Sequence, residues 1–125
     1  MRRLTAGDIT GIHAFLAEEF GGEGKPRDAA ALARLTRDLA AEGGDDLHEA
    51  AARLMAGIVQ SAPFTEGNAR TAFFAADVFL RMNGVYLRCD NVLALRFFSA
   101  LLEEGAFTAE ILLPWIRANA ERLNP

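Results

Sequence analysis

Apolar residues recur every three or four positions along most of this chain, which is the spacing of one face of an α-helix. Glycines and capping residues interrupt the pattern and divide it into about six helices. The expected helices are residues 6–20, 29–42, 46–60, 69–82, 91–104 and a last one beginning at 109. The expected N-caps are Thr5, Asp28, Asp45 or Asp46, Asp90 or Asn91, and Thr108.

The fourth of these helices, Ala69–Met82, carries alanines and Phe79 on several faces. A helix that is apolar on several sides is buried on those sides, so this one is expected to be central. Val85–Arg88 is expected to be a short extended piece. The predicted fold class is all-α: one domain over residues 1–125, a single compact bundle of about six helices around a central helix, with a short extended flap segment.

Composition narrows the function classes. The 125 residues suffice for one domain, and 51% are hydrophobic, so a sizeable core can form. The net charge of -4 argues against a nucleic-acid binder held by a diffuse basic surface, and we expect no DNA or RNA binding by the chain itself. The single cysteine, Cys89, excludes an internal disulfide.

Neither a leader segment nor a membrane anchor is predicted. Met1 is followed by a segment that reads as folded, without a charged region leading into an apolar one. No apolar run reaches the roughly 18 residues that are needed to span a bilayer. We therefore expect a cytoplasmic protein that does not bind membranes.

The turn Pro63–Arg70, between the third and fourth helices, has the features of an anion site. Gly67 permits a positive φ, so that successive backbone N–H groups can converge. Asn68 is expected to cap the helix that begins at Ala69, and a helix N-terminus favours phosphate. Arg70 is a cation in the first turn, where the helix dipole disfavours it, so a bound anion would explain its place.

Two further residues of the turn fit this interpretation. Glu66 could hold Mg²⁺ beside a phosphate, and Phe64 is expected to anchor the turn in the core. The same residues also fit an ordinary connection between two helices, with Gly67 for geometry and Asn68 for capping. Local physics leaves both interpretations open.

The stretch Ala62–Arg70 reads Ala-Pro-Phe-Thr-Glu-Gly-Asn-Ala-Arg. It resembles the Fic/Doc signature, His-Pro-Phe-x-(Asp/Glu)-Gly-Asn-(Gly/Lys)-Arg. The resemblance continues in Leu4–Asp28, which is similar to the start of the Doc branch, and in Leu47–Gly84 and Glu104–Asn119. The short length and Phe73, where longer Fic enzymes have arginine, favour the Doc branch.

This resemblance implies a transferase that moves AMP or phosphate from ATP, or another nucleoside triphosphate, to a hydroxyl of a target protein. Glu66 would ligate Mg²⁺, and Arg70 would neutralise charge that develops on the phosphates. The implied nucleotide- and phosphate-binding set is Phe64, Thr65, Gly67, Asn68, Ala69 and Arg70. The loop Gly21–Asp28 would be the flap that docks the target, through Gly22, Gly24, Lys25 and Arg27.

Partners are implied in the same way. Doc relatives are toxins that are blocked by an antitoxin, and this chain lacks the self-inhibiting motif of some Fic proteins outside the active-site turn. An antitoxin in trans is therefore expected. The target would be a protein, with a translation factor as one candidate.

Two positions depart from the signature. Ala62 stands where the family has its general-base histidine, so the chain as given should be nearly inactive. We assign neither His13, expected to be packed or at the surface, nor His48 as a substitute base. Ala69 replaces the lysine of the phosphate-transferring Doc toxin, which leaves AMP transfer open.

Two explanations for Ala62 remain. One is a His-to-Ala change that was made to silence a toxic enzyme, and the otherwise intact motif favours it. The alternative is a natural, catalytically dead Fic-fold protein that binds nucleotide or a partner helix.

Overall fold

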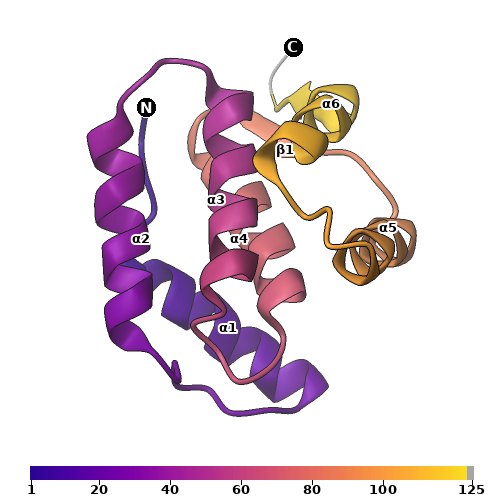
Figure 1. The fold of residues 1–125 in the computed structure, drawn as a ribbon. Coiled ribbons are helices and arrows are strands. Elements are labelled where there is room, and N and C mark those ends of the chain that lie inside the picture. Colours follow the sequence, from indigo (N-terminus) through magenta and orange to yellow (C-terminus); the bar gives the residue numbers. More distant parts are fainter. Residues whose placement is uncertain (124–125) are drawn as a thin grey trace.

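A computed structural model describes residues 1–123, which form six helices and one two-stranded sheet (Figure 1). The all-α class is confirmed, with helix bounds close to those expected from the apolar period. In chain order the elements are α1 Ala6–Phe20, α2 Ala29–Glu42, α3 Leu47–Ser61, α4 Asn68–Met82, β1 Val85–Leu87, α5 Asn91–Glu103, α6 Ala109–Asn119 and β2 Ala120–Arg122. None of these helices is long and apolar enough to cross a bilayer.

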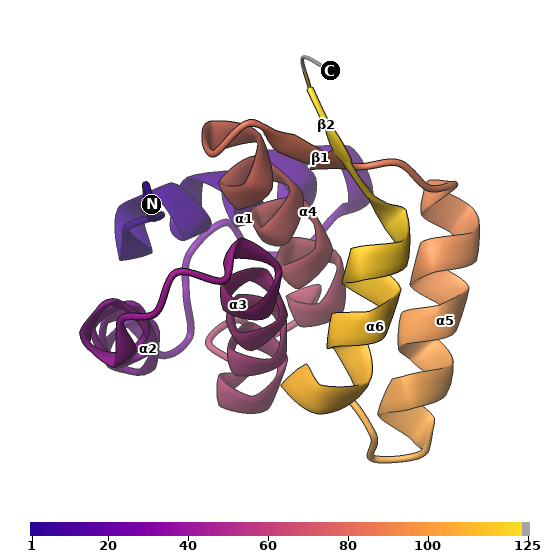
Figure 2. The same ribbon diagram turned by 90° about the horizontal axis from the view of Figure 1, so that it is seen from above.

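Helices α3 and α4 form the centre of the molecule. They pack against each other, α2 and α6 pack on α3, and α1 and α5 pack on α4. Figure 2 shows α2, α3, α6 and α5 following one another across the molecule, with α1 and α4 behind them. Small residues let the two central helices approach closely, and their buried alanines are Ala51, Ala52, Ala56, Ala72, Ala75 and Ala76. The prediction of a central fourth helix is confirmed.

An aromatic cluster holds α5 and α6 to this centre. Phe98 of α5 is fully buried, and its ring centroid lies 5.1 Å from that of Trp115 and 5.6 Å from that of Phe73. Such ring pairs add to the free energy gained from burial alone. The side chains of Phe98 and Trp115 thus connect α5, α6 and α4.

The predicted caps can be checked one by one. Thr5 and Asp8 form a reciprocal capping box at α1, and a side-chain oxygen of the N-cap accepts a backbone N–H at four further helices. Those N-caps are Asp28, Asp46, Asp90 and Thr108. Of the two pairs left open by the sequence, Asp46 and Asp90 are the caps.

The extended segment is a strand with a partner that the sequence did not predict. β1 pairs antiparallel with β2, and Val85 lies opposite Arg122 and Leu87 opposite Ala120. The loop Gly21–Asp28, which was expected to be the flap, contains no strand. The sheet therefore joins the end of α4 to the end of α6, on the far side of α4 from the turn of interest.

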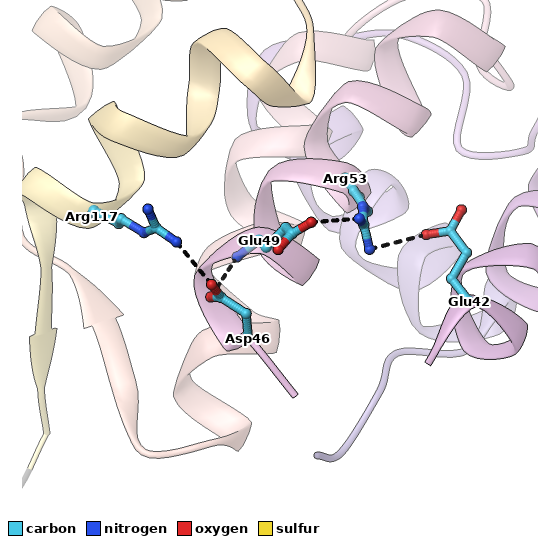
Figure 3. Close-up of polar contacts among 5 residues, drawn as sticks. All are labelled: Glu42, Asp46, Glu49, Arg53 and Arg117. Atoms are coloured by element: carbon cyan, nitrogen blue, oxygen red, sulfur yellow. Dashed lines mark hydrogen bonds and ion pairs between the residues drawn. The ribbon is translucent and has the colours of Figure 1, made fainter. Parts of the chain in front are cut away.

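Ion pairs connect three elements around the start of α3 (Figure 3). Arg117 of α6 donates to Asp46 at 2.8 Å, and Arg53 of α3 contacts both Glu49 of its own helix and Glu42 at the end of α2. The backbone N–H of Glu49 and the neighbouring Arg117 lower the pKa of Asp46 below its ordinary value. These contacts therefore hold α2, α3 and α6 together at the end opposite the Pro63–Arg70 turn.

Candidate functional site

The turn between α3 and α4 lies beside α1, at the lower end of the molecule in Figure 1. Pro63 and Phe64 are buried, with the Phe64 side chain only 1% exposed, so Phe64 anchors the turn as predicted. Thr65 and Glu66, which follow directly, are exposed. The turn therefore presents its polar residues to solvent from a fixed apolar base.

Ala62 has a left-handed backbone, with φ 45° and ψ 55°. Its N–H donates to the Ile58 carbonyl at 3.0 Å, so it caps the C-terminus of α3. Its own carbonyl accepts a hydrogen bond from the Arg27 guanidinium at 2.7 Å. The first position of the motif is thus fixed by its backbone, while its methyl group offers no proton acceptor.

The expectation that Asn68 caps α4 is wrong. Asn68 is the first residue of the helix, and its side-chain amide accepts from the Phe64 N–H at 3.1 Å and donates to the Phe64 carbonyl at 2.9 Å. These two bonds satisfy the backbone of Phe64, which lies in an irregular, buried stretch. Asn68 therefore braces the turn from inside rather than closing the helix end.

Gly67 takes the N-cap position with φ 77°, as its predicted positive φ requires. No side chain caps this helix, in contrast to α1, α2, α3, α5 and α6. The first N–H groups of an α-helix lack partners within the helix, so those at the start of α4 are available to an anion. The predicted positive φ of Gly67 is confirmed, and anion binding at this turn stays a prediction.

A cavity of about 200 Å³ opens on one side of this turn. Its lining includes Glu66, Gly67 and Arg70 of the motif, Thr71 of α4, and His13 and Phe20 of α1. His13 and Thr71, which line this cavity, each have a buried side-chain atom without a hydrogen-bond partner, His13 Nδ1 and Thr71 Oγ1. With Glu66 and Arg70 also in its lining, the cavity has a partly polar wall beside the motif turn.

A cleft of about 440 Å³ opens on the other side of the turn. The predicted residues Gly67, Asn68, Ala69 and Arg70 form one wall, and residues distant in sequence form the other. Those residues are Val59 of α3 and Leu95, Ser99 and Leu102 of α5. Local sequence gave no signal for this second wall, because α5 reaches it only through the fold.

Arg70 belongs to both cavities. Its guanidinium carbon lies 4.2 Å from the centroid of the Phe20 ring, a cation–π geometry. None of the ion pairs among residues 1–123 involves Arg70. Among these residues no carboxylate neutralises the Arg70 charge, so the guanidinium is available to bind an anion.

Several contacts tie the predicted flap to the motif. Besides the bond from Arg27 to Ala62, the Asp28 N–H donates to the Pro63 carbonyl at 3.0 Å. Gly22, with φ 108°, lies so close to Glu66 that a Cβ there would be 2.7 Å from a carboxylate oxygen. The backbone of the loop thus covers one side of the Glu66 carboxylate.

Two other residues of this loop, which were also expected to dock the target, do not face the motif in the same way. Gly24 faces Ala14 of α1, with 3.7 Å between the two Cβ positions, and Lys25 is exposed. Neither makes a contact with the motif that matches those of Gly22 and Arg27. Any part that they play in docking a target stays a prediction.

Glu66 can be tested as a Mg²⁺ ligand by the chemistry around it. Within residues 1–123, no three His, Cys, Asp or Glu side chains come together as a complete metal site. Mg²⁺ does not need one, because it is commonly held by one or two carboxylates together with substrate phosphates and water. An exposed Glu66 next to the open N-terminus of α4 fits that arrangement.

The structure also brings one histidine to the motif and leaves the other away from it. His13 of α1 is 4% exposed and contacts the motif through Phe64 and Glu66, so it is packed, as expected, but its neighbours were not foreseen. His48 lies in the first turn of α3, at the end opposite the motif. The helical period of α1 places His13 on a buried face, but nothing local predicts which turn it meets.

Comparison with known proteins identifies the family of this chain. The model of the Fic/DOC family matches residues 3–80, which include α1, the loop, α3 and the motif through most of α4. Toxin Doc of Mycolicibacterium smegmatis (strain ATCC 700084 / mc(2)155) is 39% identical over 92 residues, which cover 70% of this chain. The matched part spans 64% of the length of that protein.

Proposed function

Because this chain belongs to the Fic/DOC family, we propose that it is a Doc-like toxin that uses ATP, or another nucleoside triphosphate, with Mg²⁺. It would transfer AMP or phosphate to a hydroxyl of a target protein in the cytoplasm, where a translation factor is one candidate. The observation that carries the proposal is the uncapped N-terminus of α4, set between Glu66 and Arg70 and open to two cavities.

Each residue of the turn has a role in this proposal. The N–H groups at the start of α4 would bind phosphate oxygens, since the helix dipole favours negative charge there. Arg70, whose guanidinium lies over the Phe20 ring, would pair with the negative charge that develops on the phosphates. Phe64 and Asn68 would keep the turn in shape while the ligand changes.

Mg²⁺ would be held by Glu66 and by the nucleotide. When bound, it would neutralise phosphate charge and so favour transfer of the group. Because Gly22 has no side chain, the loop backbone can approach the Glu66 carboxylate closely, which would limit the positions that this carboxylate can take.

Ala62 sets the limit on activity. A methyl group cannot take a proton from a target hydroxyl, and the loss of a general base costs about 10²- to 10⁴-fold in rate. We therefore propose that the chain binds nucleotide and transfers very little of it, whether the alanine was introduced or arose naturally.

Restoring the base tests this proposal. Ala62→His should label a protein of a cell lysate from radioactive ATP, and the parent chain should label it about 10²- to 10⁴-fold more slowly. Label from the α-phosphate would mean AMP transfer, and label from the γ-phosphate alone would mean phosphate transfer. Ala62→Asn is the control, since asparagine tolerates the left-handed backbone and is not a base. No labelling by Ala62→His from any nucleoside triphosphate would contradict the transferase.

A partner helix is favoured by a separate observation. Phe15 and Phe20 on α1 are 62% and 60% exposed. Together with Phe74 and Val78 of α4 they line a mostly apolar groove of about 850 Å³. Exposed apolar surface of this extent is typical of interaction sites. We propose that the antitoxin supplies an apolar helix to this groove, and a catalytically dead binding protein would use the same surface.

The groove can be tested with a neighbouring gene product. A small antitoxin encoded next to this chain should co-purify with it, and Phe15→Asp should abolish the complex. Val92→Asp, at a residue of α5 that is 61% exposed, is the matched control and should leave the complex intact. If both variants lose the complex equally, or if neither loses it, the groove on α1 and α4 is not the antitoxin-binding surface.

A further inference from the structure

His13 contacts the motif turn from α1 both by ring stacking and by a hydrogen bond to the backbone of the turn. Its ring stacks on Phe64, its Nε2 donates to the Glu66 carbonyl, and a Cβ added at Gly67 would lie 3.8 Å from the same Nε2. We propose that His13 is a positioning residue that sets the orientation of the phosphate-binding turn. This inference rests on the proposed function, because it concerns how that site is held.

The stacking is close and parallel. The ring centroids of His13 and Phe64 are 3.8 Å apart, and their planes differ by 2°. Phe64 is itself 1% exposed and precedes the polar part of the turn by only one residue. The His13 ring therefore fixes the buried base from which Glu66 and Gly67 project.

The hydrogen bond has a defined direction. A backbone carbonyl can only accept, so His13 Nε2 carries the proton and donates it to the Glu66 oxygen at 3.0 Å. In a trans peptide the carbonyl and the following N–H point in opposite directions. When His13 holds the Glu66 carbonyl, it turns the Gly67 N–H away from α1. That N–H belongs to the residue that caps α4, so His13 sets the direction of the first donor at the anion site.

The His13 side chain also lines the cavity beside the motif turn. Nδ1 has no partner and His13 lines the same cavity as Glu66 and Arg70. With a single ring proton on Nε2, Nδ1 can only accept, and it is buried without a partner among the described residues. The contacts to Phe64 and Glu66 are sufficient for the positioning role that we propose, and that role assigns no proton transfer to Nδ1.

Two variants separate the two contacts. His13→Phe keeps an aromatic ring for Phe64 and removes the donor, whereas His13→Gln keeps an N–H donor near the place of Nε2 and removes the ring. His48→Phe is the matched control, because His48 lies in the first turn of α3, at the end of that helix opposite the motif turn. All three are studied as the full chain, with and without MgATP.

Two measurements are made on each variant. Amide NMR spectra without nucleotide report on Gly67 through Arg70, and titration reports the Kd for MgATP. His13→Phe should shift the Gly67 amide and weaken MgATP about tenfold, which corresponds to one hydrogen bond. His13→Gln should restore part of the amide position and part of the affinity, and His48→Phe should match the parent. Histidine spectra of the parent should show the proton on Nε2.

Three results would overturn the proposal. One is a parent-like Gly67 amide in His13→Phe, which decides the matter even if the parent binds no nucleotide. Another is a proton on Nδ1 rather than Nε2. The third comes from the Ala62→His background: if His13→Phe and His13→Gln abolish transfer equally while the MgATP affinity stays at the parent value, His13 acts as a proton acceptor and not by positioning.

Discussion

Ala62 is the residue at which backbone strain and chemistry meet. It is the only residue other than glycine with a positive φ among residues 1–123. A left-handed conformation costs a residue with a Cβ about 1–2 kcal/mol. The bonds to Ile58 and from Arg27 hold the backbone there whatever the side chain is. Because both bonds use only the backbone of residue 62, a histidine at this position can keep them.

Ala62→Gly should raise the free energy of unfolding by about 0.5–1 kcal/mol. Glycine removes the cost of the left-handed backbone, and the greater freedom of the unfolded chain cancels part of the gain. Urea denaturation measures the difference. Ser61→Gly, one residue earlier and still within α3, is the control and should lower stability. A loss of stability with Ala62→Gly would contradict the strain at this position.

Residue-scale prediction from sequence succeeded where the cause is local. Gly67 has the expected positive φ, and Phe64 is the expected anchor, because both follow from the chemistry of their own turn. Asn68 was assigned to the wrong partner, since capping and bracing use the same amide and differ only in backbone geometry. His13 was missed as a neighbour because its contacts lie 53 residues along the chain.

At the scale of elements, both ends of helix α3 are fixed by capping residues. Asp46 caps its start and receives Arg117 from α6, whereas Ala62 ends it in the motif turn (Figure 3). The helices themselves were predictable, because caps and apolar periods are local. Strand β2 was not, since Ala120–Arg122 become a strand only by pairing with β1 more than 30 residues earlier.

Asp46→Ala should lower the free energy of unfolding by about 1 kcal/mol, the usual cost of a lost N-cap. Asp46→Asn keeps a capping oxygen and loses the charge that Arg117 meets, so it should lose less. Thermal or urea denaturation measures both. Asp45→Ala, at the exposed neighbour, is the control and should stay near the parent. Equal losses at positions 45 and 46 would contradict the cap.

The same carboxylate predicts a pH dependence. The Glu49 N–H and Arg117 lower the pKa of Asp46 in the folded chain below its ordinary value of 3.8. The stability it contributes is therefore fully present above the ordinary pKa and disappears as pH falls through the folded pKa. The difference in stability between parent and Asp46→Asn should be constant from pH 5 to 7 and should shrink below about pH 4. A difference that grows on acidification would contradict the assignment.

On the scale of the whole molecule, the site is assembled from four separate parts of the chain. α1 supplies His13 and Phe20, the loop supplies Gly22 and Arg27, the segment from α3 through the motif into α4 supplies most of the rest, and α5 supplies one wall of the cleft. The motif could be recognised from sequence because its residues are contiguous. Its surroundings could not, because α5 and the first helix are brought beside it only when the bundle closes around α3 and α4.

Nucleotide binding by the unaltered chain tests the central claim most directly. Titration with MgATP should shift amides at residues 66–71, and Arg70→Ala should weaken binding roughly 10- to 100-fold, the usual effect of losing a charged hydrogen bond. Arg81→Ala is the matched control, because Arg81 lies in the last turn of the same helix and pairs with Asp77 instead. Parent-like affinity in Arg81→Ala is expected. Equal binding by all three proteins, or no binding by the parent at millimolar MgATP, would contradict a nucleotide site in the turn between α3 and α4.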